Sequence, residues 1–155
     1  MATRSNTVVI APDGAETILY RHHDGYLDGA GRDLAESMLA ADSAPALVSA
    51  LLAREVHSFL TGHLLGKSYE RVNGYAGDAE YVYRVRYGDG EPTVEVCHGF
   101  GWDEAEDARG KIRPLSAYVR ALNTLTRRQE RRWLSRQPEG QAPASPFTYL
   151  AAEAA

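Results

Sequence analysis

The chain is poor in cysteine, and this scarcity limits how its fold can be stabilised. Its one cysteine, Cys97, stands in a sequence of 155 residues, so no disulfide can form within the chain. The five histidines are scattered, and with Cys97 they do not form the paired C-x-x-C spacing typical of structural zinc sites. We therefore expect a fold that needs neither a disulfide nor a metal ion and carries no cofactor.

Long apolar runs are missing as well. No stretch approaches the roughly eighteen consecutive apolar residues expected of a membrane-spanning helix. Residues 1–6 also lack the apolar core of a secretory signal. A content of 44% hydrophobic and 25% charged residues is typical of a globular domain. These features predict a cytoplasmic protein that has no membrane partner.

Several signatures of catalysis are lacking. The sequence contains no G-x-S-x-G nucleophile elbow, no G-x-G-x-x-G fingerprint, no Walker lysine and no H-E-x-x-H motif. His57 and His63 do not have the i, i+4 spacing that places two histidines on one helix face. These absences exclude the enzyme classes defined by such motifs, but they leave other enzymes open.

Charge is distributed unevenly, although the formal net charge is only −4. Residues 1–108 carry 8 basic and 18 acidic side chains, whereas residues 109–136 carry 9 basic side chains and one acidic side chain, Glu130. Such a separation is informative about partners rather than about the fold. The basic residues near the end of the last expected helix are Arg127, Arg128, Arg131, Arg132 and Arg136, with Trp133 among them.

This basic segment has three interpretations. The arginines could hold phosphates while Trp133 stacks on a base, as in nucleic-acid-binding proteins. They could instead stabilise the carboxyl end of their helix and pair with the acidic part of the same chain or of a second copy. The third interpretation is a binding surface for a different protein. The sequence alone does not decide among them.

Alternating apolar residues predict two β-hairpins. Residues 6–22 contain two β-prone runs on either side of the turn residues 12–14. Residues 80–87 and 93–97 indicate the second hairpin. In a strand, successive side chains point to opposite faces. The first hairpin is therefore expected to place Tyr20 and His22 on one face, opposite Arg21.

Apolar residues at helical spacing predict three helices. These begin between Gly29 and Arg32, extend over residues 45–64, and run from Pro114 to about Gln137. The order of elements favours an α+β domain over residues 1–137, with a mostly antiparallel sheet of about four strands and about three helices packed on one face. Residues 138–155 are expected to form a loosely ordered tail, whose apolar cluster at 147–150 can dock.

Titratable residues are most concentrated in residues 19–31, where a strand is expected to lead into a helix. Polar junctions of this kind often carry binding or catalytic groups. His22 could act as a general base oriented by Asp24, with Arg21 or Arg4 holding an anionic group. Tyr20 and Tyr26 could add a binding surface. The alternative is a structural turn in which Asp24 caps the backbone.

The same residues resemble a family of small, functionally uncharacterised proteins of phages and bacteria. These proteins begin with a hairpin and carry the pattern Y-x-H-W-D-G-Y followed by spaced glycines. The matching residues are Tyr20, His22, Asp24, Gly25 and Tyr26, followed by Gly29 or Gly31 and Leu34. This chain departs from the pattern at His23, where the family has tryptophan, and at Leu27, where it usually has proline. The resemblance covers the first quarter of the chain and implies a shared start of the fold and a mobile-element origin, with no activity attached.

Two functional hypotheses follow. The first is a non-enzymatic interaction or regulatory protein of phage or mobile-element accessory type, which binds a protein, a second copy of itself or a nucleic acid. The second is a small hydrolase or transferase that acts on a phosphate- or nucleotide-containing substrate through His22, Asp24 and Arg21. Whether the chain is an enzyme stays open from its sequence.

Overall fold

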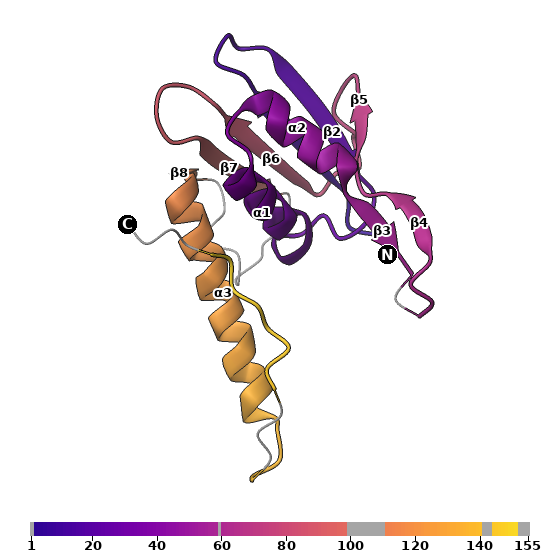
Figure 1. Cartoon of the computed structure of the whole chain (residues 1–155), viewed down its shortest axis with the longest axis vertical. Coiled ribbons are helices and arrows are strands. Elements are labelled where there is room, and N and C mark those ends of the chain that lie inside the picture. Colours follow the sequence, from indigo (N-terminus) through magenta and orange to yellow (C-terminus); the bar gives the residue numbers. More distant parts are fainter. Residues whose placement is uncertain (1, 59, 99–110, 141–143, 152–155) are drawn as a thin grey trace.

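The computed structural model describes residues 2–58, 60–98, 111–140 and 144–151. A six-stranded sheet dominates the fold (Figure 1). Its strands are β1 (Ser5–Ile10), β2 (Glu16–Arg21), β5 (Glu70–Val72), β6 (Tyr81–Arg86), β7 (Thr93–His98) and β8 (Ile112–Pro114). They are arranged in the order β5-β2-β1-β6-β7-β8, with β1 and β6 parallel and the other neighbouring pairs antiparallel.

The α+β class and the mostly antiparallel sheet are confirmed, but the expected number of about four strands is wrong. Strands β1, β2, β6 and β7 are the four predicted ones, and each has six residues. Strands β5 and β8 extend the sheet at its two edges, and a separate hairpin consists of β3 (Glu55–His57) and β4 (Leu64–Lys67). The edge strands and β3 have three residues each, too few to show an alternating pattern in the sequence.

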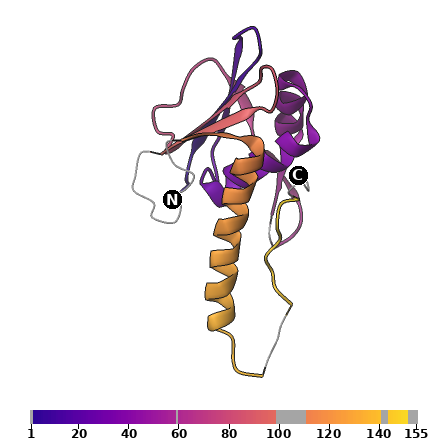
Figure 2. The ribbon, with the colours of Figure 1, turned by 90° about the vertical axis from the view of Figure 1, so that its left-hand side faces the viewer.

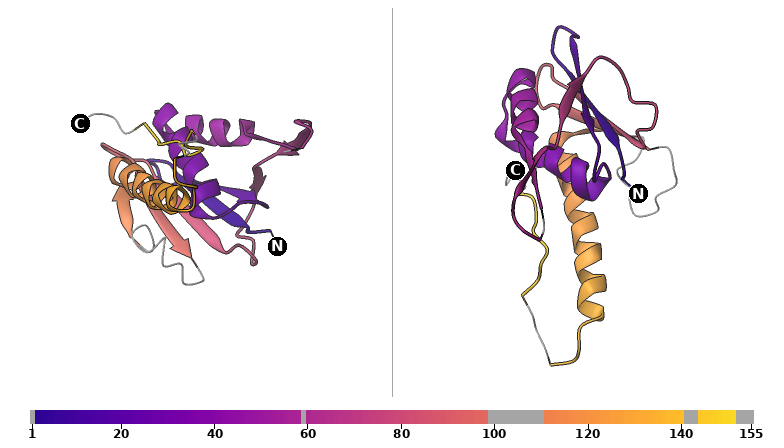
Figure 3. Two further views of the ribbon diagram at one scale, coloured as in Figure 1. Left: turned by 90° about the horizontal axis from the view of Figure 1, so that it is seen from below. Right: turned by 90° about the vertical axis from the view of Figure 1, so that its right-hand side faces the viewer.

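Helices cover one face of the main sheet (Figures 2 and 3). They are α1 (Arg32–Ala40), α2 (Ala44–Ala53) and the first half of α3 (Leu115–Ser135), while one turn of π-helix over Leu27–Gly31 leads from β2 into α1. Leu19, Tyr83 and Val85 from the covered face of the sheet belong to the same buried core as the helices. Among the described residues, no helix combines the length and apolar character that crossing a membrane requires.

The predicted helix over residues 45–64 is wrong beyond Ala53, where α2 ends and the β3–β4 hairpin begins. The Arg54 side chain turns back toward α1 and donates a hydrogen bond of 3.1 Å to Ser37 Oγ. Gly62, with a φ of +70°, lies in the loop that joins β3 to β4. Because glycine readily adopts this left-handed conformation, the sequence can reverse direction here. Local turn residues and a tertiary contact thus outweigh the apolar spacing.

The β3–β4 hairpin projects from the body as an arm (Figure 1). Its large apolar side chains Leu60, Leu64 and Leu65 are exposed, and Leu60 is 90% exposed. His63 is expected within an apolar helix stripe, but it is also exposed. The spacing of apolar residues in this segment therefore does not reflect burial against the core.

Helix α3 leaves the body after its first half (Figures 1 and 2). Its buried residues all lie between Leu115 and Thr126. Residues 144–151 run back alongside the helix, and their contact centres on buried Leu150. The Asn123 side chain accepts a hydrogen bond of 2.8 Å from the Leu150 amide and donates one of 3.0 Å to its carbonyl. This double contact fixes the end of the described chain to α3.

Candidate functional site

The junction between β2 and α1 is a close-packed turn. Asp24 has a φ of 55°, and its carbonyl accepts a hydrogen bond of 2.7 Å from the Ala30 amide. A Cβ atom on Gly25 would lie 2.7 Å from the Arg4 backbone, and one on Gly29 would lie 2.2 Å from the Asp24 carbonyl oxygen. Real Cβ atoms do not come this close to other atoms, so the glycines at these positions are steric requirements.

Two buried tyrosines donate hydrogen bonds to the backbone of this turn. The Tyr83 hydroxyl donates a hydrogen bond of 2.8 Å to the Gly25 carbonyl, and the Tyr118 hydroxyl donates one of 2.9 Å to the Gly31 carbonyl. Burial raises the pKa of both hydroxyls, so both remain protonated and able to donate. The glycine-rich junction is therefore joined to β6 and α3 through its backbone.

Arg21 points from β2 toward the helices and is largely buried. Its guanidinium forms an ion pair with Asp33, donates a hydrogen bond of 2.6 Å to the His23 carbonyl, and lies 5.4 Å from the centre of the Tyr69 ring. Burial alone would lower the pKa of Arg21, but Tyr69 and Asp33 outweigh it and raise the pKa above its usual value. Arg21 is thus a charged group inside the fold.

Arg54 completes this internal ion-pair network. It lies 3.1 Å from Asp33 through one guanidinium nitrogen and 3.1 Å from Glu36 through another. The network therefore links β2, α1 and the end of α2. Sequence reasoning missed Arg54 and Asp33; the one available signal is that Arg54 interrupts the apolar stretch expected to form a helix over residues 45–64.

His22 directly follows β2 and lies beside Tyr20 rather than Arg21, as the expected alternation predicts. Its Nδ1 accepts a hydrogen bond of 3.3 Å from Arg4 Nε and lies 3.0 Å from the Tyr20 hydroxyl. Arg4 also pairs with Asp78 at 3.1 Å. Since Arg4 Nε can only donate, the neutral imidazole carries its proton on Nε2. The one lone pair of Nδ1 therefore faces both Arg4 and the Tyr20 hydroxyl.

Asp24 is separated from this exposed cluster. Its carboxylate accepts a hydrogen bond of 3.0 Å from the Tyr26 hydroxyl. Within the described parts of the chain, no hydrogen bond or ion pair joins Asp24 to His22 or to Arg21. The structure thus brings Arg4 and Tyr20 to His22, and Tyr26 to Asp24, but it does not assemble His22, Asp24 and Arg21 into one constellation.

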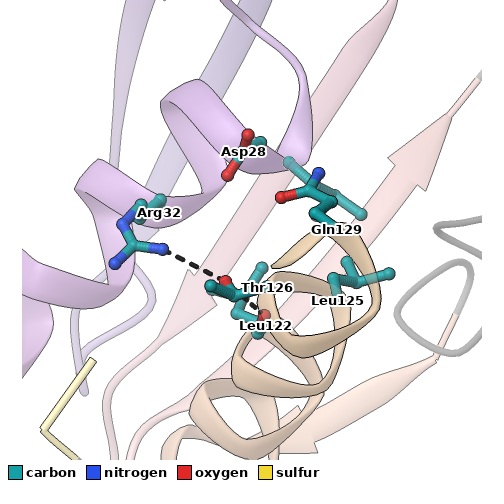
Figure 4. Close-up of a pocket in the computed structure, with 7 residues that line it drawn as sticks. Asp28, Arg32, Leu122, Leu125, Thr126 and Gln129 are labelled. Atoms are coloured by element: carbon teal, nitrogen blue, oxygen red, sulfur yellow. Dashed lines mark hydrogen bonds between the residues drawn. The ribbon is translucent and has the colours of Figure 1, made fainter. Parts of the chain in front are cut away.

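A small pocket lies between the π-helical turn and α3 (Figure 4). Its volume is about 10 Å³, which is room for about one water molecule. The lining residues are Leu27, Asp28, Arg32, Leu122, Leu125, Thr126 and Gln129. Partial burial raises the pKa of the Asp28 carboxyl, and neighbouring Arg32 opposes this shift. The pocket is a joint between two elements, too small for a substrate that carries a phosphate.

Arg32 connects the two elements on either side of this pocket by hydrogen bonds. It donates a hydrogen bond of 3.3 Å to the Thr126 hydroxyl, shown as a dashed line in Figure 4. It also donates to the Thr148 hydroxyl at 3.0 Å and to the Thr148 carbonyl. Arg32 of α1 therefore contacts both α3 and residues 144–151. Sequence reasoning missed this residue as well.

The projecting part of α3 presents the predicted basic surface, which we call the basic end of α3 (residues 127–136). Its five arginines are exposed, while Trp133 is half-buried with its ring 6.2 Å from that of Phe147. Glu130 accepts a hydrogen bond from Tyr149. Hydrogen bonds from Ser145 and Tyr149 lower the pKa of this carboxyl. The one acidic group of the surface is therefore turned toward residues 144–151.

Three arginines of the basic end have no acidic partner within the part of the chain that the structure describes. No ion pair joins Arg127, Arg131 or Arg136 to any carboxylate in the described segments. Arg127 lies 6.0 Å from the centre of the Tyr149 ring. Pairing with the acidic part of the same chain was one interpretation of this segment, and the structure does not show such pairing for these three residues.

Neither a metal site nor a similarity to known proteins indicates the function of this chain. Within the described residues, no group of three or more His, Cys, Asp or Glu side chains is placed to hold a metal ion. Comparison with protein-family models, with curated proteins and with solved structures gives no match. The function of this chain is therefore inferred from the geometry of its described residues.

Proposed function

We propose that this chain is a non-enzymatic interaction protein of phage or mobile-element accessory type, which binds nucleic acid through the basic end of α3. The observation that carries the proposal is the set of exposed arginines on a helix that extends beyond the body, with Arg127, Arg131 and Arg136 lacking carboxylate partners in the described residues. Phosphate groups are the ligands that such arginines hold well.

The spacing of the arginines supports a partner that carries many negative charges. Residues four apart lie on the same face of a helix. Arg127 and Arg131 therefore form one row, and Arg128, Arg132 and Arg136 form a second. Like charges at this spacing destabilise an isolated helix. An anionic partner would relieve that repulsion, and a row of phosphates along one strand matches a row of arginines.

Aromatic side chains beside the arginines favour nucleic acid over an acidic protein surface. Trp133, Phe147 and Tyr149 gather where residues 144–151 meet the basic end of α3, and Tyr149 is 42% exposed. Exposed aromatic rings next to arginines can stack on unpaired bases. A single strand is therefore the preferred form of the ligand in this proposal.

The geometry gives less support to the hydrolase or transferase hypothesis. His22 uses its Nδ1 lone pair on Arg4, and Asp24 is bonded to Tyr26. Arg21, the expected anion-binding residue, is engaged by Asp33 inside the fold. Each residue of the expected catalytic set thus already has a structural partner.

Binding of labelled oligonucleotides at low and high salt tests the proposal. We expect single-stranded DNA or RNA to bind at low salt and to lose affinity steeply as salt increases, because each neutralised phosphate releases a counterion. The double variant Arg127→Ala/Arg131→Ala should bind more weakly. Its plot of log K against log salt should be shallower by about 1.4 for a single strand, which is about 0.7 for each of the two lost phosphate contacts.

The double variant Arg86→Ala/Arg120→Ala is the matched control, because both of its arginines are also exposed and the change in charge is the same. Its affinity and salt dependence should remain close to those of the unmodified protein. If neither strand form binds at low salt, the nucleic-acid proposal is wrong and an acidic protein partner takes its place. Equal losses of oligonucleotide affinity in the two double variants would show that binding depends on net charge and not on the basic end of α3.

A further inference from the structure

A groove opens between α2 and the β1–β2 hairpin, and no residue of α3 contributes to it. Its volume is about 330 Å³, which falls at the lower end of the range of roughly 300–1,000 Å³ for small-molecule sites. The apolar residues that line it are Val9, Ala11, Ala15, Ala44, Pro45 and Val48. Most of these side chains are small, so the two elements approach each other without filling the space between them.

Three polar side chains complete the lining of this groove: Thr17, Ser49 and Arg71. In the β2–β5 register, Arg71 pairs with Leu19. The Leu19 side chain is buried in the core under the helices. Since paired residues on neighbouring strands share a face, the Arg71 side chain also projects on the helix-bearing side, toward α2.

The polar groups of the groove are available to a ligand. In the described part of the chain, the Arg71 guanidinium has no hydrogen bond and no ion pair. The hydroxyls of Thr17 and Ser49 likewise have no hydrogen-bond partner among those residues. A cationic group with five N–H donors thus stands beside an apolar floor with no carboxylate to neutralise it.

We propose that this groove binds a small apolar monocarboxylate, with the hydrocarbon against the alanine and valine floor and the carboxylate on Arg71. A guanidinium matches a carboxylate with two parallel hydrogen bonds. The hydroxyls of Thr17 and Ser49 can donate to the same oxygens. A single cation balances a single negative charge, whereas a phosphate dianion would leave excess charge beside apolar walls. The chemistry of the groove therefore selects one carboxylate on an apolar body.

Octanoate is a suitable probe, followed by amide chemical shifts of the whole chain during titration. We expect saturable shifts at the amides of Ala11, Ala15 and Val48. The variant Arg71→Gln should bind octanoate about tenfold more weakly, because it loses a charge-assisted pair. The variant Arg86→Gln, which removes another exposed arginine, from β6, should bind octanoate as tightly as the unmodified protein does.

Two ligands of equal chain length test the role of charge. Octylammonium should not bind, and octanol should bind about as weakly as octanoate binds to Arg71→Gln. A second variant, Ser49→Trp, places a large ring over the groove from an exposed position of α2 and should abolish octanoate binding. The amide spectra of both variants show directly whether the fold is retained.

The proposal is overturned if octanoate shifts none of the groove amides, or if Arg71→Gln binds it as tightly as the unmodified protein. Equal binding of octylammonium or octanol would also overturn it, since the groove would then not recognise a carboxylate. The groove and the basic end of α3 share no residue. Failure of one proposal therefore leaves the other unaffected.

Discussion

Replacing Gly29 with alanine is expected to lower the free energy of unfolding by about 3 kcal/mol or more, since overpacking against fixed atoms is among the costliest substitutions. The added Cβ would lie 2.2 Å from the Asp24 carbonyl oxygen and 2.9 Å from the Asp24 Cβ. Neither atom belongs to the free end of a flexible side chain. The backbone itself would have to move.

The Asp24 backbone cannot move without further losses. A shift of its carbonyl would lengthen the 2.7 Å hydrogen bond from Ala30. Asp24 also holds a left-handed conformation with a φ of 55°, and this allowed region is too small to permit much rotation. Denaturation by urea, followed by circular dichroism, measures the effect. Gly88→Ala is the control, because a Cβ at Gly88 meets nothing within 4 Å, and its effect should stay within about 0.5 kcal/mol. Similar losses in both variants would contradict the steric explanation.

The strands and helices that the sequence predicts well are those with several repeats of their pattern. β6 alternates three buried residues with more exposed ones over six positions, and α3 repeats its apolar residues over several turns. The segment after Ala53 keeps the helical spacing of apolar residues up to residue 64, yet it forms the β3–β4 hairpin. There the outcome depends on Arg54 and Gly62, whose effects come from a distant contact and a single backbone angle.

The candidate site shows a similar division. The alternation expected along residues 16–22 separates His22 from Arg21, and the contact of His22 with Tyr20 agrees with it. The steric need for glycine at positions 25 and 29 is not something the sequence predicts. The partners of these residues could not be predicted, because Asp33, Tyr83 and Tyr118 reach them only through the packing of α1, β6 and α3. The groove beside Arg71 depends on the pairing of β5, a strand too short to predict.

Replacing Arg21 with alanine is expected to cost about 3 kcal/mol of unfolding free energy, because it removes one partner of a buried ion pair. The Arg21 side chain is 10% exposed and its partner Asp33 is 26% exposed. The His23 carbonyl and the Tyr69 hydroxyl also lose their donor. Asp33 keeps Arg54 at 3.1 Å, so the loss should stay below that of a fully isolated buried carboxylate.

The variant Arg4→Ala serves as a control for the effect of burial on the energy of an arginine–aspartate pair. Arg4 also pairs with one aspartate, Asp78, but the two side chains are 33% and 58% exposed, and such pairs are worth about 1 kcal/mol or less. Urea denaturation should therefore show a larger loss of unfolding free energy for Arg21→Ala than for Arg4→Ala. In the double variant Arg21→Ala/Asp33→Ala, the added loss of Asp33 should cost less than Asp33→Ala alone, because the pair with Arg21 is already gone. If Arg21→Ala proves as mild as Arg4→Ala, the guanidinium is accessible to water in solution, and its assignment to the internal network rather than to an anion-binding site is wrong.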